Sequence, residues 1–87
     1  MIPEWLNPDP KYDYYLVGDP SQSQVVVGIR CVDQLNGSAT YDFTIWDAET
    51  GEYYNGGMFY GTTSIESTLD AILAFTFVDS TIYEKIA

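Results

Sequence analysis

Residues 24–47 read QVVVGIRCVDQLNGSATYDFTIWD, and this stretch decides the fold. Apolar and polar side chains alternate along both of its halves, which is typical of antiparallel strands with one buried face. The halves are separated by Asn36-Gly37, a dipeptide that favours a tight β-hairpin. The stretch therefore predicts two paired strands, over residues 24–33 and 39–47.

The register of this hairpin follows from its apolar pattern. A two-residue loop would place Arg30 opposite Phe43, which sets one strand's polar face against the other's apolar face. A three-residue loop over residues 35–37, with Gly37 in the left-handed conformation, pairs like with like. We therefore predict this loop and the cross-strand pairs Cys31–Tyr41, Ile29–Phe43, Val27–Ile45, Arg30–Asp42 and Val26–Trp46.

Two further strands are expected beside this hairpin, over residues 12–17 and 52–60. The second of these follows a turn over residues 47–51 and is interrupted by Gly56-Gly57, which indicates a bulge or a sharp bend. If the turn has a four-residue loop, Tyr53 lies beside Trp46 on the outer face of the sheet and Tyr54 joins the core.

One helix is expected after the last of these strands. Thr63 and Glu66 have the spacing of a capping box at a helix N-terminus. Apolar residues then recur at helical spacing, namely Ile65, Leu69, Ile72, Leu73 and Thr76, with Phe75 and Phe77 widening the stripe. The tail over residues 79–87 is compatible with either a turn of helix or a strand through Ile82 and Tyr83.

These elements predict an α+β fold, a three- to four-stranded antiparallel meander with one helix packed on one face. The chain has 87 residues, which suffices for one domain over residues 1–87 with one core. Residues 1–11 carry three prolines, which block helix and central strand alike. We expect this segment to be an extended arm anchored by Trp5 and Leu6.

The charge of the chain limits its partners. Thirteen acids face three bases, which gives a formal charge of −10. Nucleic acids and anionic membranes are bound through basic patches, so neither is expected as a direct partner. A lone cysteine, Cys31, excludes an internal disulfide, and residues 1–4 lack the basic start of an export signal. We therefore expect a cytoplasmic protein.

The sequence shows no motif for catalysis. It contains no histidine, which is the commonest general base and the commonest metal ligand. Alternation places Cys31 on the core face of its strand, where a cysteine is a packing residue. Asp47 and Glu49 miss the spacing of a calcium loop. We expect no catalytic residue, no metal and no cofactor, and hence a protein that is not an enzyme.

Two features could serve binding. The acids fall at loop tips and on outward strand positions, and such a surface suits a basic protein. On the outer sheet face Val26, Trp46 and Tyr53 should cluster, and either the arm covers them or they are open to a partner or a homodimer. The predicted partner-binding residues are Trp46, Asp47, Glu49, Glu52 and Tyr53.

In size, acidity, single-domain layout and lack of catalytic residues, the chain resembles small phage-encoded anti-defence proteins. These include anti-CRISPR proteins and nucleic-acid mimics. The resemblance is one of composition, covers no alignable stretch and assigns no residue a role. It implies a stoichiometric inhibitor that occupies a nucleic-acid-binding surface of a protein in the host cytoplasm.

The leading hypothesis is therefore a non-catalytic inhibitor whose acidic surface binds a basic, nucleic-acid-binding protein. The alternative is a small structural or assembly protein of a phage or mobile element that forms oligomers through its sheet. A third hypothesis is a small-molecule sponge built at an oligomer interface, although three bases are few for binding phosphate-bearing ligands.

Overall fold

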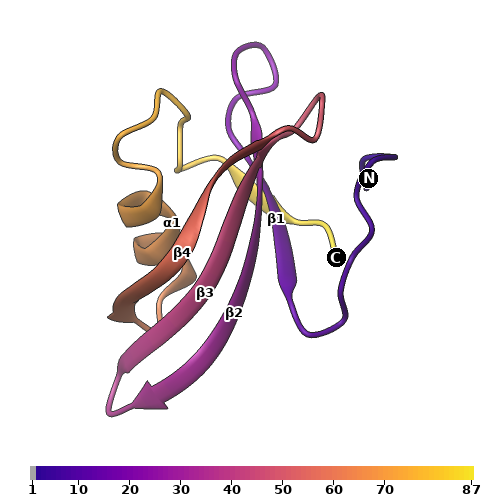
Figure 1. Ribbon diagram of the computed structural model, residues 1–87. Coiled ribbons are helices and arrows are strands. Elements are labelled where there is room, and N and C mark those ends of the chain that lie inside the picture. Colours follow the sequence, from indigo (N-terminus) through magenta and orange to yellow (C-terminus); the bar gives the residue numbers. More distant parts are fainter. Residues whose placement is uncertain (1) are drawn as a thin grey trace.

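Five strands and one helix make up residues 2–87, the part of the chain that the computed structural model describes (Figure 1). All strand pairs are antiparallel, and the sheet order is β4-β3-β2-β1-β5. The elements are β1 (Asp13–Val17), β2 (Val25–Leu35), β3 (Ser38–Asp47), β4 (Tyr53–Thr62), α1 (Ile65–Ile72) and β5 (Tyr83–Lys85).

The expected α+β fold, with an antiparallel sheet and one helix, is confirmed. The first four strands are neighbours in chain order, as in a meander. After α1 the chain returns to the far side of β1, where β5 pairs with it. The tail therefore forms a strand, and this makes the sheet five-stranded instead of three- or four-stranded.

The core register of the β2–β3 hairpin is confirmed, but the predicted loop is wrong. All five predicted cross-strand pairs are present, from Cys31–Tyr41 to Val26–Trp46. Leu35 nevertheless pairs with Ser38, so the loop has two residues, and Asn36 and Gly37 have φ values of 50° and 84°. A register shift between Cys31 and Asp33 leaves one extra residue, Val32, in a β-bulge. This bulge supplies the residue that we had assigned to the loop.

The expectation that Cys31 belongs to the core is wrong. Its thiol is free and exposed, although it is paired with the buried Tyr41. Burial along β2 ends at Ile29, because the remainder of the strand lies in the part of the hairpin that extends past α1 (Figure 1).

The β3–β4 pair brings Trp46 opposite Tyr53, as predicted. Tyr54 does not join the core, because a register shift places it in a bulge, where it is 52% exposed and stacks on Phe75. We predicted a bulge or a sharp bend at Gly56-Gly57, and no bulge is present there, since both glycines keep their register with β3.

Helix α1 begins one residue later than predicted. Its N-cap is Ser64, whose side chain accepts a hydrogen bond from the Ser67 N–H. The capping box of Thr63 and Glu66 is therefore wrong. The helix ends at Ile72, so the helical spacing that would bury Phe75 and Phe77 does not continue, and both side chains are exposed.

The main core lies between α1 and one face of the sheet. Burial of each large apolar side chain in such a core contributes roughly 1.5–3 kcal/mol. The buried residues are Val17, Val25, Val27, Ile29, Ala39, Tyr41, Phe43, Ile45, Leu69, Ile72 and Leu73. No helix among residues 2–87 is long and apolar enough to cross a membrane.

The other face of the sheet is covered in part by the arm, which packs on Trp46, and cover by the arm was one of the two alternatives for this face. The rings of Trp5 and Tyr14 both lie next to the Trp46 ring, with centroid distances of 5.9 and 6.2 Å. Beneath them, a Cβ atom at Gly28 would lie 2.9 Å from the Tyr14 ring and 3.0 Å from the Trp46 ring. Glycine at this position therefore lets the two aromatic rings pack directly on the sheet.

We predict that Gly28→Ala lowers the free energy of unfolding by about 1–3 kcal/mol, because the new methyl group overpacks this face. Chemical denaturation followed by tryptophan fluorescence measures the effect. In a Trp46→Leu background the same substitution should cost less, since one of the two clashing rings is absent. An equal cost in both backgrounds would contradict this packing.

Candidate functional site

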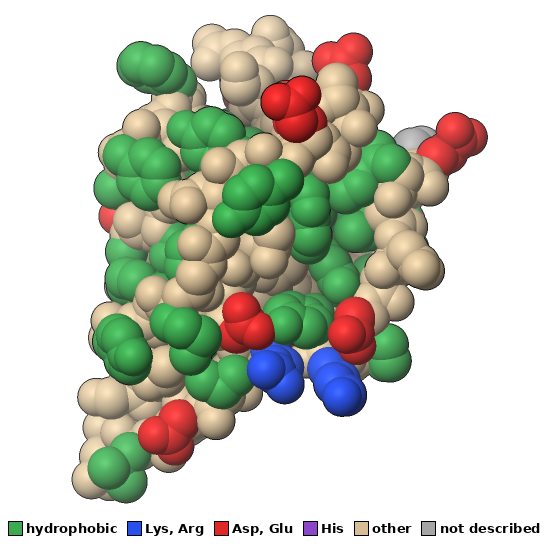
Figure 2. Space-filling model, in the orientation of Figure 1, with side chains coloured by type: hydrophobic (Ala, Val, Ile, Leu, Met, Phe, Trp, Pro, Cys, Tyr) green, Lys and Arg blue, Asp and Glu red, His purple; other side chains and the backbone are tan. Residues whose placement is uncertain are grey.

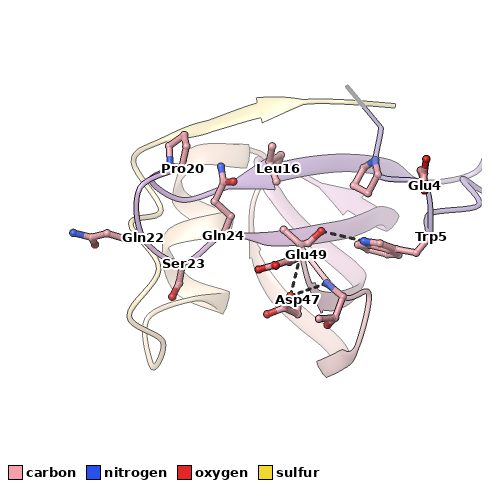
Figure 3. A pocket seen from close by; sticks show the side chains of 12 residues that line it. Glu4, Trp5, Leu16, Pro20, Gln22, Ser23, Gln24, Asp47 and Glu49 are labelled. Atoms are coloured by element: carbon pink, nitrogen blue, oxygen red, sulfur yellow. Dashed lines mark hydrogen bonds between the residues drawn. The ribbon is translucent and has the colours of Figure 1, made fainter.

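An open groove of about 970 Å³ lies at one end of the sheet (Figure 3). Three segments form it: the arm, the β1–β2 loop and the turn between β3 and β4. Its lining residues are Pro3, Glu4, Trp5, Leu16, Pro20, Gln22, Ser23, Gln24, Asp47, Ala48, Glu49 and Thr50.

Trp5 fixes the arm against the β3–β4 turn. Its indole Nε1–H donates a hydrogen bond of 3.0 Å to the Ala48 carbonyl oxygen. The ring also lies against Gly51, where an added Cβ atom would be 2.6 to 2.9 Å from ring atoms. Gly51 has a φ of +76°, so the turn and the arm both require glycine there. The Ala48 N–H in turn donates to the Gln24 carbonyl oxygen, which joins the turn to the β1–β2 loop.

Asp47 shapes the turn that forms one wall of the groove. Its Oδ1 accepts hydrogen bonds of 2.9 Å from the backbone N–H groups of Glu49 and Thr50. The bond from the Thr50 N–H lowers the pKa of Asp47 below its usual range; desolvation opposes this shift, and the bond from the Glu49 N–H adds to it. Asp47 is therefore charged at neutral pH, while its geometry serves the turn.

The same local arrangement recurs in two other loops. Asp19 accepts hydrogen bonds from the backbone and side chain of Ser21, and these bonds lower its pKa. Asp79 accepts corresponding bonds from the side chain and backbone of Thr81, which lower its pKa. Several of the acids at loop tips thus have a structural role in addition to their charge.

The groove is acidic. Carboxylates of Glu4, Asp47 and Glu49 line it, and no lysine or arginine is among its described lining residues. Arg30 and Lys85 lie elsewhere, in ion pairs of 3.5 and 3.3 Å with Asp42 and Asp13. Figure 2 shows acidic side chains dispersed over the visible face and not gathered in one block.

The structure brings only some of the predicted contact residues together. Asp47 and Glu49 line the groove, whereas Trp46, Glu52 and Tyr53 do not line the part of it that residues 2–87 form. Trp46 is half-buried beneath Trp5, so it supports the surface from below. Tyr53 is 63% exposed beside it. Glu52 is exposed at the base of the turn, where its carbonyl oxygen accepts the Asp47 N–H.

Glu4, Leu16 and Gln24 also line the groove, and the sequence did not identify them. They come from the arm, from β1 and from the β1–β2 loop, which are far apart in the sequence. The anchoring of the arm by Trp5 was the only available signal that residues near it would reach the β3–β4 turn.

A second polar cluster lies at the other end of the arm. The Tyr12 hydroxyl donates a hydrogen bond to Asp42 Oδ2, and this bond raises the pKa of Tyr12. The Arg30 guanidinium lies 5.4 Å from the centre of the Tyr12 ring and pairs with the same carboxylate. These contacts hold the arm on the sheet. Among residues 2–87, no group of three or more His, Cys, Asp or Glu side chains is arranged to hold a metal ion.

Comparisons with protein-family models, with curated proteins and with solved structures found no significant match to this chain. We therefore infer the function from the chain's own surface, charges and strand edges.

We predict that Asp47→Ala lowers the free energy of unfolding by about 0.5–1.5 kcal/mol at neutral pH, because two backbone N–H groups lose their acceptor. Asp47→Asn is the matched control, since its amide oxygen can accept the same bonds. The folded-state pKa of Asp47 is lowered, so its stabilising effect is present above the unfolded-state pKa and is lost as pH falls through the folded-state pKa.

The difference in stability between the native chain and Asp47→Ala should therefore shrink on acidification through that range. Urea denaturation at a series of pH values measures it. A difference that grows at low pH, or an Asn variant as unstable as the Ala variant, would contradict this role of Asp47.

Proposed function

We propose that this chain is a non-catalytic protein-binding protein whose acidic surface occupies a basic, nucleic-acid-binding surface of a partner protein. One observation carries the proposal: Glu4, Asp47 and Glu49 surround one groove that has no basic side chain among its described lining residues. These carboxylates present negative charge. A nucleic-acid-binding protein binds negative charge when it contacts the phosphate groups of its nucleic acid.

Electrostatic attraction gives such a protein its speed of association. A net charge of −10 on an 87-residue chain produces a long-range field, and opposite charges on a partner increase the rate of encounter. Two of the three bases are in ion pairs with Asp42 and Asp13, neither of which is among the described lining residues of the groove. Among the described lining residues, the groove carboxylates therefore have no lysine or arginine to neutralise them.

Rigidity of the surface contributes to affinity. The turn that carries Glu49 is held by Asp47 and by the Trp5–Ala48 hydrogen bond, so less ordering entropy is lost on binding. We propose Asp47, Glu49, Glu52 and Tyr53 as contact residues, with Trp46 supporting them from beneath. The exposed ring of Tyr53 is of the residue type that is enriched in interface hot spots.

We further propose that the protein acts as a stoichiometric inhibitor of the kind found among phage-encoded anti-defence proteins, in the cytoplasm of the host cell. This step relies on the resemblance in size, charge and lack of catalytic motifs. An inhibitor needs a binding surface and no catalytic group, and we propose the groove with its carboxylates as that surface.

The proposal predicts that a partner captured from a host lysate on the immobilised chain associates more slowly as salt rises and after charge reversal. The double variant Glu49→Lys/Glu52→Lys should reduce the association rate by about tenfold or more at low ionic strength. The matched control is Asp70→Lys/Glu84→Lys, which makes the same change in net charge at two exposed positions away from the β3–β4 turn. Surface plasmon resonance measures the association rates at about 50 mM and about 500 mM salt. The higher concentration screens the attraction between charges, so it should slow the association of the native chain.

The control should retain a clearly faster association than the turn variant. The proposal fails if affinity is insensitive to salt and unaffected by the turn variant. Equal losses in both variants would also contradict it, because they would indicate attraction by net charge without a defined acidic site.

A further inference from the structure

The two edges of the sheet are built very differently. β5 has only three residues, two of them charged, and its Lys85 forms an ion pair with Asp13. Short length and charge are the devices by which natural proteins prevent an edge strand from pairing with another chain. β4 has ten residues, YYNGGMFYGT, without a charged residue or a proline. Apart from the bulge at Tyr54, β4 has none of these protective features.

Exposed aromatic and apolar side chains accompany this edge. On the sheet face opposite α1, Tyr53, Met58 and Tyr60 are 63%, 51% and 76% exposed. On the other face, Tyr54 stacks on Phe75 with the ring centres 6.4 Å apart. Figure 2 shows hydrophobic side chains along the side of the molecule where Figure 1 places β4 and α1. Exposed apolar patches of this kind mark interaction surfaces.

The backbone of β4 has hydrogen-bonding groups free for another strand. The Thr63 N–H donates to the Gly37 carbonyl oxygen, which fixes the phase of the β3–β4 ladder. In an antiparallel ladder, alternate residues direct their N–H and C=O groups away from the partner strand. With this phase, the outward residues include Met58 and Tyr60, which are paired with Asp42 and Thr40 of β3.

The charges around β4 select the kind of occupant. From Cys31 to Glu84 the sequence contains no lysine or arginine, and this span includes β3, β4 and α1. Glu52 immediately precedes β4, and Glu66 lies on the exposed side of α1 just after it. A second copy of the chain would add its own charge of −10, and the two would repel each other. A basic strand would be attracted instead.

We propose that β4 is a docking edge for an extended, lysine- or arginine-rich segment of the partner, which adds to the sheet as a sixth strand. Backbone hydrogen bonds to the outward groups of β4 supply affinity, and alternate apolar side chains of the segment pack on Met58 and Tyr60. Its basic side chains face the acids at the two ends of the strand. This inference rests on the proposed function and specifies how the basic partner is bound.

A designed peptide tests the proposal without knowledge of the partner. The probe is a peptide of alternating lysine and valine, about eight residues long, which is a usual strand length. The matched probe is a lysine–proline peptide of equal length and charge, since proline has no N–H to donate. Amide hydrogen exchange of the full chain, read by NMR, reports on Met58 and Tyr60 individually.

The lysine–valine peptide should slow exchange of the Met58 and Tyr60 amides by about tenfold or more at saturation, and the lysine–proline peptide should not. Met58→Lys should abolish this protection, because it places a charge on the edge and repels the basic peptide. Phe77→Lys is the matched control, since Phe77 is 102% exposed and the variant adds the same charge outside β4. It should retain the protection.

Both peptides could bind equally well and change NMR chemical shifts only in the acidic loops. That result would overturn strand addition while supporting the acidic binding surface. If neither peptide binds at low salt, both proposals are overturned. Protection of the same amides that rises with protein concentration and needs no peptide would identify a second copy as the occupant. That result would also overturn the inference.

Discussion

The fold depends on the register between β2 and β3. The side chains of a strand alternate between two faces, so one slipped residue would move every core side chain of β2 to the wrong face. The Asn36-Gly37 turn alone would produce that slip, and the bulge at Val32 reverses it. With the register set, Val27, Ile29, Phe43 and Ile45 face α1 and Val26 and Trp46 face the arm. Both layers of the molecule are built on this one alignment.

The sequence correctly predicted the strand pairs and buried helix positions that follow from the local alternation of apolar and polar side chains. The five β2–β3 pairs, the Trp46–Tyr53 pair and the helix residues Leu69, Ile72 and Leu73 were all correct. The errors concern where an element ends or absorbs an extra residue. A bulge at Val32 and a longer loop give the same pairing in the core, so the pattern could not distinguish them. The exposure of Cys31, Phe75 and Phe77 depends on how far α1 extends over the sheet.

The groove was beyond the reach of sequence patterns for a similar reason. Asp47 and Glu49 are neighbours in the chain, and their turn could be recognised from its composition. Glu4 joins them only because Trp5 packs on Gly51 and donates to Ala48, a contact between segments more than forty residues apart. The same contact buries part of Trp46, which changes that residue from an exposed anchor to an internal support.

We propose that the chain's acidity serves to occupy a basic, nucleic-acid-binding surface, and a competition experiment with nucleic acid is the direct test. The partner is immobilised through its complex with this chain, and labelled duplex DNA or RNA is then added. We expect mutually exclusive binding, so nucleic acid should bind only as this chain dissociates. A stable ternary complex, with nucleic acid bound at full affinity while this chain remains in place, would contradict it.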